Sequence, residues 1–321
     1  MATFLSILDQ SPVISGLGAR RAIEETLALA RRADQLGYHR YWLAEHHAIA
    51  ALADPCPEIL LARLGAETKR MRIGTGGVLL PYYSAFRTAE SFRMLEALYP
   101  GRIDLGIGRA PGGDARTAQA VAGGGFPDAA RFPQQVLELK SLLEGSHRAV
   151  RLQPEVDTVP QIWLLGSSDY SGALAAQLGL AFAFAHFINP RGGELVTRAY
   201  RNNFRGEKPR AIVCTFAIVA ETDEEAERLA APIDLRRLHM ALNIDSPVPT
   251  DEEAARHRYS EDERHYVRSQ RERAVIGGVE KAVRELKALV ERYAADELMI
   301  LTITGDYESR RRSYELLIEA F

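Results

Sequence analysis

Along this chain, short apolar runs alternate with longer segments in which apolar residues recur every three or four positions. The short runs predict strands, and the longer segments predict helices that bury one face. Eight strands are predicted, at residues 4–8, 40–44, 71–77, 102–109, 161–165, 180–185, 210–220 and 297–303. Helices are predicted at residues 20–36, 55–69, 84–98, 132–143, 171–178, 193–204, 223–242, 279–293 and 307–321.

The order of these elements indicates a parallel sheet. Helices fill the gaps between successive strands, and parallel neighbours need a connection of a dozen or more residues. Strands and helices alternating in this way along one continuous chain predict an α/β protein with a (β/α)₈ TIM-barrel fold. We expect a single domain over residues 1–321, with a late insertion; a doubly wound open sheet is the alternative.

Two stretches and one helix start need separate predictions. Residues 110–127 are rich in glycine and longer than a strand-to-helix connection requires, so we expect a mobile active-site loop there. Residues 245–270 are charged, contain prolines and hold few aliphatic side chains, which predicts a surface insertion with some helix, or a lid. Asp54 and Pro55 are predicted to cap and begin the second helix.

Composition narrows the class of protein. Apolar residues make up 46% and charged residues 26%, as in a globular protein with a sizeable core. The net charge of −3 gives no indication of nucleic-acid binding, and no apolar run has the length of a membrane helix. The chain enters its first strand without a signal-peptide pattern, and its two cysteines, Cys56 and Cys214, have no zinc or disulfide spacing. A cytoplasmic enzyme is therefore expected.

Two strand ends carry residues suited to an anion. Arg109 ends the strand at 102–109 beside glycines that let a ligand approach the backbone, and a guanidinium suits a phosphate. Ser167, Ser168 and Ser171 lie where a strand passes into a helix, and free N–H groups at a helix start bind anions. The alternatives are a surface salt bridge for Arg109 and ordinary N-capping for the serines. Together these residues predict a phosphate site.

Two further strand ends carry candidate chemistry. His46 and His47 follow Glu45 directly; neighbouring side chains on an extended strand point in opposite directions, so we do not expect both to bind one metal ion. There are two alternatives: one histidine packs against Glu45 and does no chemistry, or one imidazole donates or accepts a proton in a pocket. Gly76 and Gly77 form either a simple turn or a backbone against which a flat ring can lie.

Several of these segments resemble, in order and spacing, the signatures of the bacterial luciferase-like monooxygenases. They are Trp-Leu-Ala-Glu-His-His at 42–47, Ile-Gly-Thr-Gly-Gly-Val-Leu-Leu-Pro at 73–81, and Gly-Arg-Ile-Asp-Leu-Gly-Ile-Gly-Arg at 101–109. Weaker likeness continues through residues 166–168, 175–180 and 297–300, so the resemblance covers nearly the whole chain.

The resemblance implies a (β/α)₈ barrel that uses reduced FMN, or a reduced deazaflavin as the alternative, and it implies a homodimer. By position, His46 corresponds to the catalytic histidine, and Gly76 and Gly77 to a non-prolyl cis peptide beneath the flavin ring. Arg109 corresponds to the arginine that holds the flavin phosphate, and Ser167, Ser168 and Ser171 belong to the matching phosphate loop. Light emission does not follow, because the reactive thiol of luciferases has no counterpart here.

The implied reaction is oxygenation of a small, apolar organic substrate by O₂, with reduced flavin supplied by a separate reductase. The predicted loop and insertion are candidates for closing the site. Apolar residues that indicate a hydrophobic substrate pocket are Leu79, Leu80, Tyr82, Phe184 and Phe187, and core packing is the alternative explanation for them. The competing functions are a deazaflavin-dependent dehydrogenase, a non-catalytic flavin-binding protein and a metal-dependent barrel hydrolase.

Overall fold

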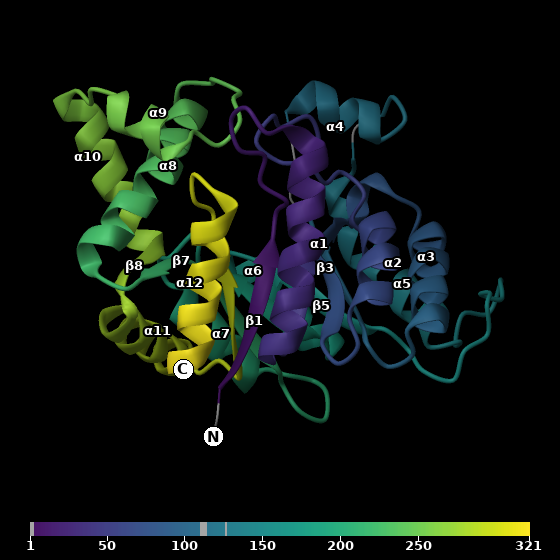
Figure 1. Ribbon diagram of the computed structural model, residues 1–321. Coiled ribbons are helices and arrows are strands. Elements are labelled where there is room, and N and C mark those ends of the chain that lie inside the picture. The colour runs from purple at the N-terminus through teal and green to yellow at the C-terminus, as the bar shows by residue number, and fades with distance from the viewer. Residues whose placement is uncertain (1–2, 110–113, 126) are drawn as a thin grey trace.

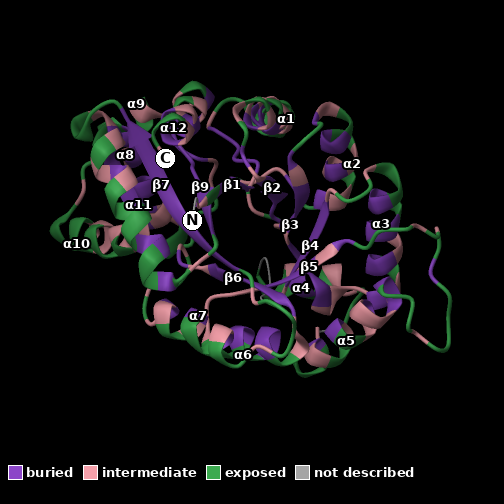
Figure 2. Ribbon diagram, turned by 90° about the horizontal axis from the view of Figure 1, so that it is seen from below, coloured by how far each residue is buried: buried purple, intermediate pink, exposed green. Residues whose placement is uncertain are grey.

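The computed structural model describes residues 3–109, 114–125 and 127–321, and it is built around a closed barrel of parallel strands (Figure 1). The strands follow one another in chain order around the barrel, and pairing between β6 and β7 closes it. Helices surround the barrel on the outside (Figure 2). The predicted (β/α)₈ TIM-barrel fold is therefore confirmed, and the open doubly wound sheet is wrong.

The eight barrel strands match the eight predicted runs to within a few residues. They are β1 (Phe4–Asp9), β2 (Arg40–Leu43), β3 (Arg72–Leu79), β4 (Ile103–Gly108), β5 (Gln161–Gly166), β6 (Ala181–Ala185), β7 (Ala211–Ala220) and β9 (Glu297–Leu301). Because all of them run in parallel, their carboxyl ends meet at one end of the barrel, where barrel enzymes place their active sites.

The predicted helices are also present. They are α1 (Gly18–Leu36), α2 (Pro57–Glu67), α3 (Ala85–Leu98), α5 (Phe132–Leu143), α6 (Asp169–Leu178), α7 (Gly193–Asn202), α8 (Asp223–Ala241), α11 (Val279–Tyr293) and α12 (Tyr307–Ala320). The predicted start of α2 is wrong by two residues: Cys56 is the N-cap and Pro57 occupies the first turn. Asp54 instead accepts a hydrogen bond from the N–H of Cys56 at 3.0 Å.

The predicted glycine-rich loop is partly helical. Residues Ala115–Val121 form α4, whose start is capped by Asp114. The Asp114 carboxylate accepts hydrogen bonds from the N–H groups of Arg116 and Thr117, which is enough to begin a short helix. A second short helical turn, η2, covers Ala129–Arg131. Residues 110–113 and 126 of the predicted loop lie outside the described residues.

One strand was not predicted. Residues Ala274–Gly278 form β8, which pairs in parallel with Phe216–Ala220 at the far end of β7. This pairing exists because β7 continues beyond its last partner on β9, which is Leu301 opposite Phe216. A five-residue run that ends in two glycines carries too weak a periodic signal to predict this strand.

Residues 245–270 contain two short helices, α9 (Asp251–Arg256) and α10 (Glu261–Gln270), each begun by a capping box. Both lie near α8 at the end of the barrel where the strands terminate (Figure 1). The stretch before α9 is fixed to the barrel, because Val248 donates to the carbonyl of Val13 and accepts from Ser15, both at 2.8 Å. None of the described helices has both the length and the apolar character to cross a membrane.

The strands separate two apolar layers. On β7, Ile212, Cys214 and Phe216 face the barrel interior, whereas Val213 and Ala217 face the surrounding helices. This alternation follows from the two-residue period of a strand. Residues of α8 such as Ile233 belong to the interior layer, so one face of this helix packs against it beside β7 and β8.

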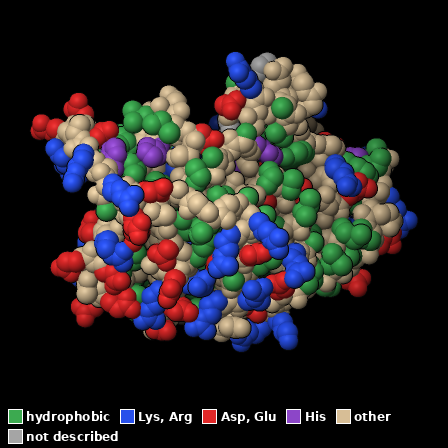
Figure 3. Space-filling view, turned by 45° about the horizontal axis from the view of Figure 1, so that its top comes forward, with side chains coloured by type: hydrophobic (Ala, Val, Ile, Leu, Met, Phe, Trp, Pro, Cys, Tyr) green, Lys and Arg blue, Asp and Glu red, His purple; other side chains and the backbone are tan. Residues whose placement is uncertain are grey.

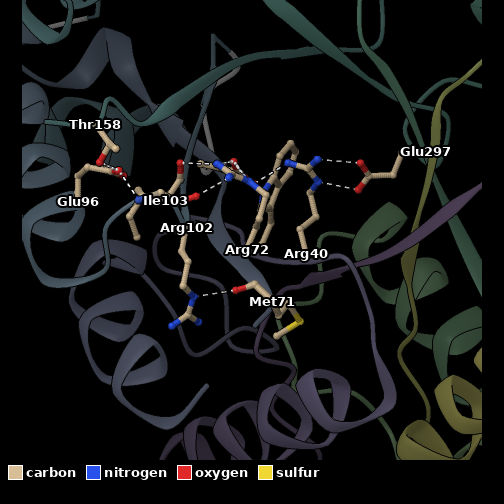
Figure 4. A network of polar contacts seen from close by, with 11 residues as sticks. Arg40, Met71, Arg72, Glu96, Arg102, Ile103, Thr158 and Glu297 are labelled. Atoms are coloured by element: carbon tan, nitrogen blue, oxygen red, sulfur yellow. Dashed lines mark hydrogen bonds and ion pairs between the residues drawn. The ribbon is translucent and has the colours of Figure 1, made fainter. Parts of the chain in front are cut away.

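The opposite, amino-terminal end of the barrel is filled by a buried network of charges (Figure 4). Arg40 donates to Glu297 at 2.6 and 2.8 Å and to Asp104 at 2.6 Å, and Arg72 donates to the other oxygen of Asp104 at 2.8 and 2.6 Å. The Arg40, Asp104 and Glu297 side chains are almost completely buried. This network closes the amino-terminal end, so an internal ligand has to enter where the strands terminate.

Candidate active site

A cavity of about 840 Å³ lies where the strands terminate. Figure 3 tilts this end toward the viewer and shows a hollow between two raised parts of the surface. The structure brings all the predicted site residues to the lining of this one cavity: His46, Gly76, Gly77, Arg109, Ser167, Ser168 and Ser171. Its size is within the range of pockets that hold a cofactor or a small ligand.

Gly76 and Gly77 form a bare stretch of backbone in the cavity wall. The peptide bond between them is cis, as the family resemblance implied. A Cβ atom on Gly77 would lie 2.4 Å from the Leu165 Cδ1 atom and 2.5 Å from the Gly106 carbonyl oxygen. On Gly76 it would lie 2.6 Å from Leu8 Cδ1. Only glycine fits at position 77, where the overlap is with backbone, and a Cβ atom at position 76 would require Leu8 to move; the pair leaves bare backbone in the wall against which a ring can lie.

The ends of β4 and β5, beside the glycine pair, carry groups that suit an anion. Ser168 is the N-cap of α6, and its hydroxyl makes no capping hydrogen bond. The guanidinium of Arg109 lies over the Tyr170 ring, with Cζ 4.4 Å from the ring centre. The start of α6, the hydroxyls of the three serines and the Arg109 guanidinium converge here, and each of these groups favours the binding of a phosphate.

The two adjacent histidines have different surroundings. His46 lines the cavity, and burial, with a smaller effect from the neighbouring His47, lowers the pKa of His46 to about 4. Its Nδ1 atom is buried and makes no hydrogen bond within the described part of the chain. His47 instead points to Glu45, with Nε2 2.7 Å from Oε1. The imidazole of His46 is therefore neutral at ordinary pH and is available to a ligand.

Glu45 joins two strand ends, a role that sequence reasoning did not predict. Its buried carboxylate accepts hydrogen bonds from the Leu79 N–H at 2.9 Å and from the Tyr83 hydroxyl at 2.6 Å, in addition to the His47 contact. The sequence suggested a contact with a histidine but carried no signal for Leu79 or Tyr83, which lie more than thirty positions away. Glu45 therefore fixes the end of β3 just beyond the glycine pair.

The predicted apolar lining is only partly correct. Leu79 and Phe187 line the cavity, but Leu80, Tyr82 and Phe184 do not belong to its lining. Phe184 faces the outer helices, because on β6 the alanines point inward and the phenylalanines outward. The interior side chains Leu8, Trp42, Cys214 and Met299 line the cavity instead. Counting alternate positions along each strand would have found them.

The residues present fit a planar, phosphate-bearing cofactor. An anion-binding wall, a flat glycine backbone and a neutral imidazole meet in one largely apolar cavity. These features define the class of protein: a barrel enzyme that binds a ring-containing cofactor where its strands terminate. Comparison with known proteins identifies the family. The model of the luciferase-like monooxygenase family matches residues 3–296, and the chain belongs to this family of flavin-dependent oxidoreductases.

Individual relatives match over nearly the full length. The protein YwcH of Bacillus subtilis (strain 168) is 45% identical over 328 residues, which cover 99% of this chain and 98% of its own. The N-acetyl-S-alkylcysteine monooxygenase of the same organism is 35% identical over 327 residues, covering 98% of this chain and 97% of the relative. The crystal structure of apo-MsnO8 has a TM-score of 0.92 and 36% identity, covering 100% of this chain and 98% of that chain.

More distant solved structures share the fold alone. The oxygenating constituent of 3,6-diketocamphane monooxygenase, in complex with FMN, has a TM-score of 0.74 at 18% identity. An F420-dependent secondary alcohol dehydrogenase has a TM-score of 0.72 at 14% identity. Both an FMN enzyme and a deazaflavin enzyme are thus built on this barrel.

Proposed function

We propose that the protein is a monooxygenase that uses reduced FMN and O₂ to oxygenate a small, largely apolar organic substrate. The observation that carries this proposal is the meeting, in one cavity, of the Arg109 and serine wall with the Gly76–Gly77 backbone and His46. A relative of 35% identity named as a monooxygenase, rather than as a dehydrogenase, supports oxygen insertion over hydride transfer.

Each part of the cavity has a role in this proposal. Arg109, Ser167, Ser168 and Ser171 hold the phosphate, and the Gly76–Gly77 backbone supports the ring. When bound, reduced FMN supplies the electrons that activate O₂. The protein contributes orientation and the exclusion of water, because the remaining walls are apolar.

His46 handles protons beside the reacting centre. Its imidazole is neutral above a pH of about 4, so near neutrality an unprotonated ring nitrogen faces the reactants and can accept a hydrogen bond or a proton that is being transferred. Glu45 is a positioning residue, because its carboxylate accepts from the Leu79 N–H and so holds the end of β3. Replacing His46 by alanine should therefore lower turnover without removing cofactor binding.

The substrate space lies among apolar side chains. Trp42, Cys214, Met299 and Phe187 line the part of the cavity away from Arg109. The printed name of the relative, N-acetyl-S-alkylcysteine monooxygenase, adds thioethers to aldehydes as compounds to be screened. A separate reductase is proposed as the source of reduced FMN. A cytoplasmic location remains a prediction.

A homodimer is proposed as the assembled state. Three large apolar side chains on the outer faces of α2 and α3 are exposed: Ile59 by 70%, Met94 by 56% and Leu98 by 53%. Exposed apolar groups on neighbouring helices are typical of interaction surfaces. Light scattering should give the mass of a dimer, and Met94→Glu should shift it toward the monomer. A wild-type mass of 35.6 kDa would contradict this proposal.

The segment 245–270 is proposed as a cover for the cavity. Its first residues are anchored at Val248, whereas α10 buries none of its side chains, so movement is expected in α10. The loop at 110–127 is the other candidate. Limited proteolysis with and without FMN tests both segments, and cleavage that is equally fast in both conditions argues against closure.

The experiment that tests the proposed function is an anaerobic titration with reduced FMN, followed by a screen for substrate-dependent oxygen consumption. We expect saturable binding of reduced FMN and oxygen uptake with at least one aldehyde or thioether in the wild type. His46→Ala should bind FMN but lose most of the uptake. Binding of reduced deazaflavin without oxygen uptake would favour the dehydrogenase instead. Cofactor binding with no reaction of either kind would favour a flavin-binding protein.

A further inference from the structure

Two adjacent arginines of α8, Arg236 buried and Arg237 half-buried, have buried N–H donors without hydrogen-bond partners among the described residues. Arg236 is only 5% exposed, and its Nε and Nη1 atoms make no hydrogen bond among the described residues. The Nη1 atom of Arg237 is likewise buried and has no hydrogen-bond partner in that part of the chain. Buried guanidinium groups are normally paired with acceptors, because an unpaired buried charge is strongly unfavourable. This pair therefore has the capacity to bind an added anion.

The carboxylates nearby are held by other groups. Asp234 accepts from Arg271 at 3.0, 2.9 and 2.5 Å. Asp245 accepts from the Ala50 N–H at 3.0 and 3.2 Å, and its Oδ1 atom forms a long ion pair with Arg236 Nη2 at 4.0 Å, which is beyond hydrogen-bond distance. Neither carboxylate satisfies the donors of the two arginines.

The position of Arg237 relates it to the cavity. Its Cζ atom lies 4.7 Å from the centre of the Phe216 ring. Phe216 follows Cys214 by two positions on β7, and both side chains face the barrel interior. Cys214 lines the cavity. Two residues along a strand span about 7 Å. The Arg237 guanidinium therefore lies about that distance beyond Cys214, toward the opening of the cavity.

Two further contacts connect this region to the cavity rim. Arg273 donates from Nη1 to the carbonyl oxygen of Ile188, a cavity-lining residue, at 3.2 Å. Asp245, the neighbour of Arg236, holds the backbone next to Ile49, which also lines the cavity. Arg236 therefore lies near the rim at Ile49, and Arg237 lies near Phe216 at the outer part of β7.

This site is separate from the phosphate wall. Arg109 follows β4, whereas Phe216 is on β7, three strands further around the barrel. One phosphate cannot contact both regions across the intervening strands β5 and β6. An anion at Arg236 and Arg237 therefore belongs to a second ligand.

We propose that Arg236 and Arg237 bind an anionic group of the substrate, and that the substrate is an apolar molecule carrying a carboxylate. This inference rests on the proposed function, because the proposed function assigns the other part of the cavity, at Arg109 and the serines, to the cofactor. A guanidinium pairs with a carboxylate through two parallel hydrogen bonds, which suits the free donors of this pair. The apolar part of the substrate would then lie against Trp42 and Met299.

The test compares hexanoate with hexanamide, which has the same chain but no charge. Binding is followed through the fluorescence of Trp42 and by calorimetry, in the absence of flavin. In the wild type, hexanoate should bind at least about tenfold more tightly than hexanamide. Arg236→Gln and Arg237→Gln should each weaken hexanoate binding by about tenfold and leave hexanamide binding unchanged. Arg237→Lys should retain part of the preference.

Arg256→Gln on α9 is the matched control, because the Arg256 side chain is 80% exposed, and it should bind hexanoate as the wild type does. No preference for hexanoate in the wild type would overturn the proposal, and this comparison does not depend on any variant folding. Equal hexanoate affinity in the wild type and in both folded glutamine variants would also overturn it. A separate titration with FMN tests the proposed function. A failure of the anion-site proposal can therefore be distinguished from a failure of the proposed function.

Discussion

The guanidinium of Arg109 lies 4.4 Å from the centre of the Tyr170 ring. The residue that follows β4 is thereby placed over the first turn of α6, beside the serine hydroxyls. Stacking on an aromatic ring holds a guanidinium in one orientation. It uses none of the N–H donors, which point outward in the plane of the guanidinium. The donors remain free for a phosphate.

Arg109→Ala should weaken FMN binding by about ten- to a hundredfold, because a charge-assisted contact to the phosphate is lost. Arg109→Lys should have an intermediate affinity, since lysine keeps the charge but not the planar fork. Equilibrium titration with FMN measures both. Tyr170→Phe retains the ring and is the control. Unchanged affinity in Arg109→Ala would show that the phosphate is bound elsewhere.

Gly77→Ala should destabilise the protein by about 1–3 kcal/mol, because its Cβ atom would overlap Leu165 and the Gly106 carbonyl. FMN binding should also be lost, since the cavity wall has to move. Denaturant unfolding and FMN titration test these two effects. Gly125→Ala is the matched control: the nearest atom to its added Cβ lies 4.0 Å away, so both properties should stay as in the wild type. Normal stability of Gly77→Ala would contradict the prediction.

Arg40→Met should cost about 3–5 kcal/mol of stability, because it leaves Asp104 and Glu297 buried at the closed end of the barrel with less compensation. Arg20→Met removes a pair with Glu24 in which the arginine is 94% exposed, and it should cost about 1 kcal/mol or less. The unfolding midpoints of the two variants in urea give the comparison. Similar losses in both would show that the buried network is not a major source of stability.

Acid should destabilise the fold partly through its buried histidines. Burial lowers the pKa of His186 to about 4, with Arg292 contributing, whereas an unfolded histidine has its ordinary value of 6.5. Between pH 6.5 and 4 the unfolded state therefore binds the proton and the folded state does not, so stability falls as the pH is lowered. The contribution of one such group is at most about 1.4 kcal/mol per pH unit.

His186→Gln should therefore show a shallower loss of stability between pH 6.5 and 4 than the wild type. Urea unfolding at half-unit pH steps measures the slope. His265 is exposed on α10, and His265→Gln should leave the slope unchanged. A slope in His186→Gln as steep as that of the wild type would mean that this histidine is protonated in the folded state.

Local patterns in the sequence were sufficient to predict most of the fold. The eight barrel strands and the helices between them follow from two-residue and three-to-four-residue periods, which reflect which face is buried. The strand β8 was missed because its existence depends on the extra length of β7, a tertiary property. The helix α4 was not predicted because it lies within a glycine-rich stretch, although the Asp114 carboxylate caps its start.

The candidate site was predictable where it lies at strand ends. Arg109, His46 and Ser168 each follow a barrel strand, and parallel topology brings such positions to one end. Contacts made by distant elements were not predictable in this way. Glu45 reaches Leu79 across neighbouring strands, and Arg237 contacts Phe216 only because α8 packs beside β7. No spacing in the sequence encodes either contact.

The central claim is that the wall formed by Arg109 and the three serines recognises the phosphate of a flavin. The most direct measurement is the affinity of the wild-type protein for reduced FMN compared with reduced riboflavin, which has the same ring and no phosphate. The account predicts that FMN binds at least about tenfold more tightly, and that Arg109→Ala removes most of this difference. Equal affinity for the two compounds in the wild type would contradict it.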